Sequence, residues 1–293
     1  MKKFAIVLPT FNRCELLEKT LQQLLKQAEE NSNIKVHIIV VNDGSNDGTE
    51  EMINEKFPDV IQKKTTGNYW YTRSMNVGFE EAVKLDVDYV LTLNDDIELN
   101  EEYLKQIAKA IFKYSEPIIM GSTSVTYEEP HRVTFSGVKE IKWWRFKKIT
   151  YHEYLEEIPK NTLTGEKESL LLPGRGMLID IKIINNIGFF EPKLLQYASD
   201  DEFCYRAIKK GFKVYVSWDA IIYSHHELTG EGTPQLRQSL FRFVKSFSNK
   251  YSRNYWRKHF FIIWKYGIKL FFPFTISIVF LGEFYSYFKY RFK

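Results

Sequence analysis

The chain has 293 residues, of which 44% are hydrophobic, so it can bury a full core and is not a disordered chain. Its two cysteines exclude a disulfide framework and a cysteine zinc site, and a net charge of +4 is too small to indicate a nucleic-acid-binding protein. The first residues lack the apolar length and cleavage site of a secretory signal, which predicts a cytoplasmic protein.

Charge is divided between an acidic body and a basic tail. From Arg237 to the end, 12 Lys and Arg accompany a single acid, Glu283, whereas the preceding residues carry 29 bases and 36 acids. The tail is rich in aromatic residues, and 13 uncharged residues separate Lys269 from Glu283. A spanning helix needs about 20 apolar residues, so this run predicts instead a helix lying in an anionic membrane surface. A helical pair packed on the body, or a homodimer interface, is the alternative.

Short apolar runs alternate with helical patterns over the first 115 residues, which predicts an α/β fold with a mostly parallel sheet and helices on both faces. The apolar run at Phe4–Leu8, for example, is typical of a buried parallel strand. Strands are predicted at Phe4–Leu8, Val36–Val41, Val60–Lys63 and Asp88–Leu93, and helices at Cys14–Ala28, Gly48–Phe57, Thr72–Lys84 and Asn100–Tyr114, with Asn12 and Asn100 as N-caps.

The pattern beyond residue 115 is less regular. Residues 116–170 indicate mixed strands and loops. Helices are predicted at Met177–Ile187 and Asp200–Lys210, ending at Gly188 and Gly211, and strands at Phe212–Val216 and Ala220–Tyr223.

Polar residues follow three of the predicted strands. Each cluster alone fits ordinary turn chemistry. Because the carboxyl ends of parallel strands meet at one edge, where open sheets bind ligands, three such clusters predict one site. The clusters are Pro9, Thr10, Asn12 and Arg13; Asn42, Asp43, Gly44 and Ser45; and Asn94, Asp95 and Asp96.

Two adjacent carboxylates, Asp95 and Asp96, follow the strand predicted at Asp88–Leu93. Such a pair repels itself unless a cation or hydrogen-bond donors neutralise it, and Mg²⁺ commonly uses one or two carboxylates together with phosphate oxygens. A helix-capping loop is the alternative. The chain has neither a G-x-G-x-x-G after the first strand nor a P-loop, which argues against a dehydrogenase or a P-loop enzyme.

Two further clusters lie in the second half of the chain. Acids crowd together at Ser199-Asp200-Asp201-Glu202, more than a favourable helix dipole requires, and Asp200 or Asp201 can serve as a general base. His225 and His226 follow the last predicted strand, where a histidine pair is a candidate for metal binding.

Taken together, these residues resemble family 2 glycosyltransferases with the GT-A fold, over about residues 3–230. The block at Gly67–Gly78 is most similar to bacterial rhamnosyltransferase-type enzymes that build surface polysaccharides. The matching stretches are Ile6–Arg13, Val40–Thr49, Gly67–Gly78, Asn94–Asp96, Ser199-Asp200 and Arg206-Ala207.

The resemblance implies a donor site for a nucleoside-diphosphate sugar. Asp43 would hydrogen-bond the base, which favours UDP or dTDP, and Asp95 would lie near the ribose. Asp96 would bind Mg²⁺ or Mn²⁺ together with His225, with His226 as its substitute. The donor site implied comprises Pro9, Thr10, Asn12, Arg13, Asp43, Gly44, Gly67, Asn68, Arg73, Asn94, Asp95, Gly174, Arg175 and Gly176.

The resemblance also implies an inverting transfer in which Asp200 is the base. The family's acid-Asp pair reads Ser199-Asp200 here, so Asp201 stays open as a substitute. Processive synthases of this broad class carry a Q-x-x-R-W motif. That motif does not occur here, so the resemblance favours addition of a single sugar. We expect a catalytic domain over 1–230 and a helical segment over 231–293 that holds the enzyme peripherally on the inner face of the cell membrane, near a lipid-linked glycan acceptor.

Two other classes remain as alternatives. A sugar-nucleotide nucleotidyltransferase shares a related sheet, but it would need a glycine-rich basic loop after the first strand. Pro9–Arg13 contains no glycine. A non-catalytic glycosyltransferase-like scaffold would not need all of Asp96, Asp200 and His225.

Overall fold

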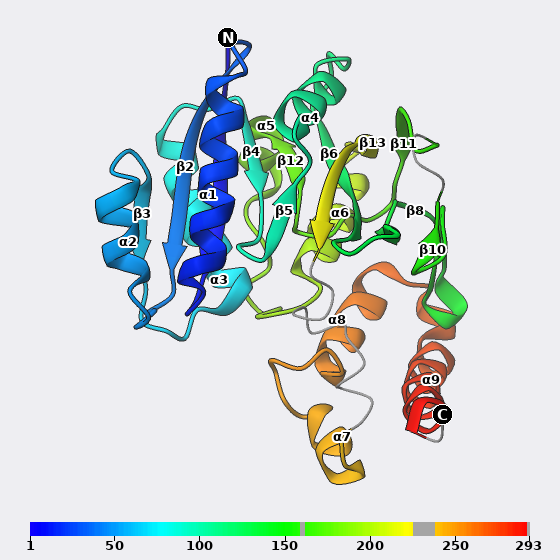
Figure 1. Ribbon diagram of the computed structural model, residues 1–293. Coiled ribbons are helices and arrows are strands. Elements are labelled where there is room, and N and C mark those ends of the chain that lie inside the picture. The colour runs from blue at the N-terminus through cyan, green and yellow to red at the C-terminus, as the bar shows by residue number, and fades with distance from the viewer. Residues whose placement is uncertain (159–161, 225–237, 292–293) are drawn as a thin grey trace.

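The computed structural model describes residues 1–158, 162–224 and 238–291. One large mixed sheet forms its centre, with a separate hairpin of β8 (Val138–Lys142) and β9 (Lys147–Thr150) beside it (Figure 1). The strands of the large sheet are β1 (Lys2–Thr10), β2 (Ile34–Asn42), β3 (Ile61–Lys64), β4 (Tyr89–Thr92), β5 (Ile97–Leu99), β6 (Ile118–Thr126), β7 (Arg132–Phe135), β10 (Glu156–Glu157), β11 (Glu166–Glu168), β12 (Met177–Asp180) and β13 (Lys213–Ser224).

The strands that carry the predicted polar clusters are parallel neighbours. Their order is β3-β2-β1-β4, followed by β12, which runs antiparallel between β4 and β6. β13 pairs in parallel with β6 on the far side. The carboxyl ends of β1, β2 and β4 therefore lie side by side, as predicted.

Helices cover both faces of the sheet, because its strands are apolar on both sides. Along β1, Phe4, Ile6 and Leu8 pack with one set of helices, whereas Ala5 and Val7 pack with the other. One face carries α1 (Cys14–Glu29), α2 (Thr49–Lys56) and α4 (Tyr103–Ile111), and the other carries α3 (Trp70–Lys84), α5 (Ile181–Ile187) and α6 (Ser199–Lys209).

One predicted helix is wrong in its first half. Met177–Ile187 contains strand β12 and then the short helix α5, which Asp180 caps by accepting a hydrogen bond from the backbone N–H of Lys182 at 2.8 Å. Met177, Leu178 and Ile179 are fully buried between two strands. A short apolar run has no periodicity that separates a buried strand from a helix, so the neighbouring strands decide.

The end of the sheet also differs from the prediction. The two strands expected at Phe212–Val216 and Ala220–Tyr223 form the single strand β13, whose pairing with β6 shifts register between Ser217 and Ile221. The extra residues of a bulge interrupt the apolar pattern without ending the strand. The short strand β5, which pairs with β13, was not predicted.

Both predicted N-caps are wrong. α1 begins after Arg13, and its first N–H, on Cys14, is accepted by Asp47 at 2.9 Å, from the loop after β2. α4 begins after Glu102, although Asn100 still accepts from the backbone N–H of Glu102 at 3.2 Å. Asn12 instead has a left-handed φ of 52°.

The C-terminal helices lie beneath the edge where β2 and β13 end (Figure 1). α8 is part of the main core, because its buried Ile262 packs in the same cluster as Phe203 of α6. α9 packs on the short helix η1 (Trp143–Arg145), and its buried Tyr287 stacks on Phe243 of α7 with ring centroids 4.3 Å apart. The C-terminal elements are α7 (Leu240–Ser246), α8 (Trp256–Tyr266), η3 (Lys269–Phe271) and α9 (Phe272–Arg291).

Candidate functional site

A cavity of about 430 Å³ lies where β1, β2 and β4 end. It brings together most of the residues singled out in the sequence, from stretches as distant as Pro9 and Asp200. The predicted residues that line it are Pro9, Thr10, Arg13, Asp43, Gly67, Asn94, Asp95, Asp96, Gly174, Arg175 and Asp200.

The two carboxylates after β4, Asp95 and Asp96, both form ion pairs with Arg13. Nη1 of Arg13 lies 2.8 Å from Oδ1 of Asp95 and 2.8 Å from Oδ2 of Asp96. Both acids are buried, with 4% of each residue exposed, and burial raises the pKa of Asp95 to about 6 although Arg13 opposes the shift. A single guanidinium therefore only partly compensates two buried carboxylates.

One oxygen of the acid pair has no hydrogen-bond partner among the described residues and is a candidate to bind a metal ion. This oxygen is Oδ1 of Asp96, and its burial makes that unusual for a carboxylate. The described ranges contain no group of three His, Cys, Asp or Glu side chains that could hold a metal by themselves. One carboxylate fits Mg²⁺ or Mn²⁺ if the substrate's phosphate oxygens supply other ligands. His225 and His226 lie outside the described residues.

Asp43 organises the wall of the cavity. Its Oδ1 accepts from Thr65 Oγ1 at 2.5 Å and from the N–H of Gly67 at 2.9 Å, and its Oδ2 accepts from the N–H groups of Tyr69 and Trp70, each at 3.0 Å. A carboxylate offers about four acceptor positions. The loop before α3 occupies them, so contact with a base through Asp43 remains a prediction and would have to replace one of these bonds.

Five of the predicted donor residues do not line this cavity. Asn68 and Arg73 are exposed, on the loop before α3 and on α3 itself. Asn12 joins two loops, because its Oδ1 accepts from the N–H of Asn46 at 2.8 Å. Gly44 packs so closely that a Cβ there would lie 2.9 Å from the backbone nitrogen of Gly67.

Gly176 is also outside the cavity wall and supports the strand behind it. Its N–H donates to the carbonyl of Thr92 at 2.7 Å. Its φ is +82°, and a Cβ would lie 2.6 Å from Oγ of Ser122. Gly174, by contrast, lines the cavity, and the hydroxyl of Tyr71 occupies the space where its Cβ would be. Glycine is needed at both positions for close approach.

Asp200 is held firmly at the start of α6. Its Oδ2 accepts from the N–H of Gly174 and its Oδ1 from the N–H of Asp201, both at 2.9 Å. Ala198, the residue before α6, has a left-handed φ of 71°, which turns the chain so that α6 begins at the cavity. Burial, and then the neighbouring charge of Asp201, raise the pKa of Asp200 to about 6.

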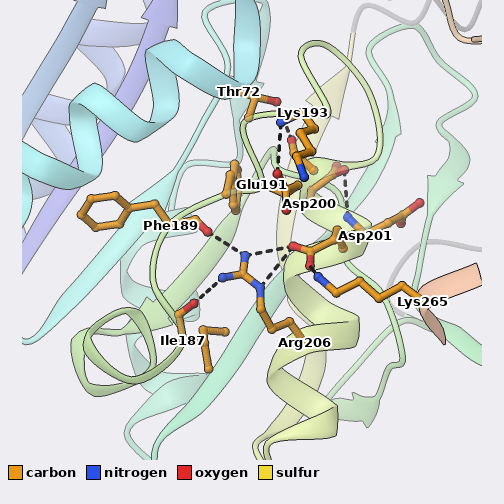
Figure 2. Close-up of polar contacts among 12 residues, drawn as sticks. Thr72, Ile187, Phe189, Glu191, Lys193, Asp200, Asp201, Arg206 and Lys265 are labelled. Atoms are coloured by element: carbon orange, nitrogen blue, oxygen red, sulfur yellow. Dashed lines mark hydrogen bonds and ion pairs between the residues drawn. The ribbon is translucent and has the colours of Figure 1, made fainter. Parts of the chain in front are cut away.

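The three crowded acids have three different environments; Figure 2 shows Asp200 and Asp201, and the Arg206 and Lys265 side chains below them. Asp200 lines the cavity, and Asp201 pairs with Lys148 at 2.6 Å. Glu202 is fully buried and accepts from Lys265 at 2.8 Å and from Arg206 at 2.9 Å. Burial alone would raise the pKa of Glu202, but its cationic and hydroxyl partners outweigh it and lower that pKa. Glu202 thus joins α6 to α8 and has no place in the cavity.

The family model for glycosyl transferase family 2 matches residues 5–165, which is more than half of the chain. The chain belongs to this family. The match includes the cavity residues that follow β1, β2 and β4 and ends before Asp200.

Two curated relatives agree with this assignment. An uncharacterized glycosyltransferase of Mycoplasma genitalium is 29% identical over 36% of this chain and 35% of its own length. The poly(ribitol-phosphate) β-N-acetylglucosaminyltransferase TarP of Staphylococcus aureus is 27% identical over 43% of this chain and 38% of its own length. These matches span little more than a third of either relative.

Solved structures share the GT-A fold of this glycosyltransferase. TarS of S. aureus has a TM-score of 0.53 at 17% identity, covering 84% of this chain and 40% of TarS. GalNAc-T7, solved with UDP, GalNAc and Mn²⁺, has a TM-score of 0.58 at 13% identity, covering 76% of this chain and 44% of GalNAc-T7. The predicted fold class is confirmed: an α/β protein with parallel central strands, helices on both faces and a C-terminal helix.

Sequence reasoning missed the aromatic part of this cavity. Trp70 and Tyr71 line the cavity, and Trp70 stacks on Tyr251 of the C-terminal segment with ring centroids 4.0 Å apart. The hydroxyl of Tyr71 is buried and has no hydrogen-bond partner within the described part of the chain. The signal was present in the run Tyr69-Trp70-Tyr71. The other lining residues that were missed are Phe11, Ser74, Pro173, Gln196 and Tyr197.

Proposed function

We propose that this glycosyltransferase moves one sugar from a uridine or thymidine diphosphate-sugar to an acceptor hydroxyl, with inversion at the anomeric carbon. The observation that carries the proposal is that Asp96 and Asp200, more than a hundred residues apart, line one cavity with Arg13 and Arg175. A volume of about 430 Å³ lies within the range of small-molecule sites. The structures of TarS with UDP and with UDP-GlcNAc support a uridine nucleotide.

In this proposal the acid pair holds the diphosphate end of the donor. Asp96 would bind Mg²⁺ or Mn²⁺ through its unpartnered oxygen, and a bound divalent cation supplies stabilisation of the charge that grows on the leaving diphosphate. Arg13 reduces the repulsion between the buried carboxylates and an anionic donor. Arg175, which also lines the cavity, adds a second positive charge.

Asp200 is the proposed base. With a pKa near 6 its carboxylate is ionised at neutral pH and is more basic than an ordinary aspartate. The acceptor oxygen would bond to the anomeric carbon as the bond to the diphosphate breaks, and its proton would pass to Asp200. Attack opposite the leaving group gives inversion. The N–H groups of Gly174 and Asp201 keep the carboxylate oriented.

A donor screen tests the proposal. We expect UDP- or dTDP-sugars, but not GDP-sugars, to raise the melting temperature and to be hydrolysed slowly with Mn²⁺, and excess EDTA to stop hydrolysis. Undiminished turnover in excess EDTA would show that the reaction needs no metal ion. Pyrophosphate formation from a nucleoside triphosphate and a sugar phosphate would identify a nucleotidyltransferase. Donor binding with no hydrolysis or transfer to any acceptor would identify a binding scaffold.

The acceptor is proposed to be a glycan of the cell surface, reached at the cytoplasmic membrane face. TarP, whose name states a poly(ribitol-phosphate) acceptor, supports a surface polymer. The C-terminal helices support membrane contact, because Phe241, Leu270 and Leu281 are 76%, 85% and 69% exposed. By length and composition, the helix at Lys269–Lys289 is also apolar enough to cross a membrane, longer than the uncharged run predicts.

Vesicle sedimentation tests the membrane contact. Replacing Phe241, Leu270 and Leu281 by Ser should reduce binding to anionic vesicles, whereas Val83→Ser, an exposed residue of α3, should not. Point changes are preferable to truncation, because deleting α8 would remove Ile262 from the main core. Unchanged sedimentation of the triple variant would mean that these side chains do not bind the membrane. Loss of concentration-dependent dimerisation would assign them to a homodimer interface.

A further inference from the structure

A second cavity, of about 730 Å³, lies between the catalytic part and helices α8 and α9. It adjoins the first, because four residues line both, whereas Asp95 and Asp96 line only the first. The shared residues are Pro173, Arg175, Tyr197 and Asp200. Asp200 therefore borders two spaces, one on the side of the acid pair and one on the side of the C-terminal helices. Since a base must reach the acceptor hydroxyl, the second space is where an acceptor can approach it.

The second cavity is strongly cationic. Six Lys and Arg side chains line it against three carboxylates, and one of these carboxylates, Asp201, is already paired with Lys148. This excess contrasts with residues 1–236, which are acidic overall. The cationic residues are Arg145, Lys147, Lys148, Arg175, Arg253 and Lys258.

Lys258 is the most unusual of these residues. Only 9% of it is exposed, and its ammonium has no ion-pair partner among the described residues. Its nitrogen lies 5.3 Å from the ring centroid of Tyr197. Burial, and then Arg253, lower the pKa of Lys258 to about 7, although Asp201 and Glu283 oppose the shift. A buried amine beside an open cavity is stabilised as a cation when an anion enters.

Two more buried polar atoms of the same cavity lack partners. Nε of Arg145 and Nε2 of His259 have no hydrogen bond within the described ranges. Buried polar atoms nearly always have hydrogen-bond partners in folded proteins, so atoms without partners at the wall of a cavity point to a ligand. Guanidinium and ammonium groups together suit phosphate oxygens, which accept several charge-assisted hydrogen bonds at once.

We propose that this second cavity is the acceptor site, and that Lys258, Arg253 and Arg145 bind a phosphate or diphosphate group of the acceptor there. The inference rests on the proposed glycosyl transfer. The acceptor is therefore a phosphate ester. When its phosphate is bound in this cavity, a hydroxyl of the same molecule lies close enough to Asp200 to be deprotonated. Ile278 and Val279 of α9 form an apolar wall of the cavity. The phosphate can thus belong to a lipid carrier or to a polyol phosphate.

Calorimetric titration of the full chain with inorganic pyrophosphate tests the site without turnover. EDTA keeps metal complexes from forming, and saturating UDP fills the donor cavity. We expect one bound pyrophosphate, and an affinity lowered at least about tenfold in Lys258→Met. Arg253→Met should also weaken pyrophosphate binding, and because Arg253 is exposed, this variant should fold like the parent. The matched control is Arg257→Met, because Arg257 lies next to Lys258 on α8 and lines neither cavity.

The titration has clear contrary results. Absence of pyrophosphate binding, or equal affinity in Lys258→Met and the parent, would overturn the phosphate site. A loss of UDP affinity equal to the loss of pyrophosphate affinity in Arg253→Met would assign the cations to the donor. If the parent enzyme shows neither donor hydrolysis nor transfer, the proposed function fails, but pyrophosphate binding still decides the nature of this cavity.

Transfer assays then separate the sources of the phosphate. A short-chain polyprenyl-diphosphate glycoside in vesicles, a soluble polyol phosphate and a neutral glycoside serve as acceptors. We expect Lys258→Met to raise the KM of a phosphorylated acceptor about tenfold, with kcat and the donor KM nearly unchanged. Transfer only to the lipid assigns the phosphate to a lipid carrier, and transfer to the soluble compound assigns it to a polymer. Equal KM for the neutral glycoside would contradict the proposal.

Discussion

Replacing Asp200 by Asn removes one charge and leaves the shape of the site. Asp200 has a pKa of about 6, so ionising it at neutral pH costs the folded state up to roughly 3 kcal/mol relative to an unfolded pKa near 3.9. Partial exposure to solvent reduces this figure. Asn has only one acceptor oxygen, so either the Gly174 or the Asp201 N–H loses its partner, at about 1 to 2 kcal/mol.

The variant should therefore be inactive and slightly more stable. Loss of the base predicts a fall in kcat of about 10² to 10⁴-fold. The remaining gain of about 1 kcal/mol predicts a melting temperature higher by about 2 to 4 °C. Because the folded pKa lies above the unfolded one, the cost of ionisation is absent below about pH 4 and complete above about pH 6. The difference in melting temperature should grow with pH through this window.

The parent enzyme gives the complementary measurement. Since the base must be ionised, kcat/KM should rise about tenfold between about pH 5 and pH 7 and then level off. Asp86→Asn, at a carboxylate whose side chain is 97% exposed, should change neither activity nor stability. Asp201→Asn should lose the Lys148 pair but retain most activity. Full activity in Asp200→Asn, or abolished activity in Asp201→Asn alone, would refute the assignment of Asp200.

Three further changes test the framework of the site. Glu202→Gln should lower the free energy of unfolding, measured in urea, by about 3 kcal/mol, because it leaves Lys265 and the buried network without a counter-charge. The control is Glu80→Gln, at an exposed residue. Equal stability of the two variants would contradict this prediction. Asp43→Ala should weaken UDP binding at least about tenfold by calorimetry, because the loop before α3 loses its acceptor; unchanged affinity would show that the loop holds without it. Arg13→Met should raise the donor KM by a similar factor, and a lowered KM would mean that Arg13 competes with the donor.

Local signals predicted much of the fold and much of the lining of the first cavity. Continuous apolar runs such as Phe4–Leu8 are buried on both faces, so their composition alone indicates a parallel sheet. The polar clusters after these strands meet in one cavity because parallel strands end at the same edge. No such rule separates a strand from a helix at Met177–Asp180, where the contacts with β4 and β6 decide.

The three acids at the start of α6 mark the limit of the local signal. Asp200, Asp201 and Glu202 are adjacent and chemically alike, and the sequence indicates only that acids gather at a helix start. Successive helical residues point about 100° apart, so one enters the cavity, one meets Lys148 and one is buried against α8. Each role depends on an element far away in the chain.

The amino-acid sequence by itself determined the alternation of strands and helices, the family, and the edge of the sheet at which charge gathers, because these follow from near-neighbour patterns. Only the tertiary structure decided that α8 of the C-terminal segment is part of the core and that α8 and α9 border a second, cationic cavity beside Asp200. The basic residues of the tail look like a solvated surface in the sequence. The folded structure buries Lys258 among them, with its ammonium over the ring of Tyr197, and burial disfavours its charged form.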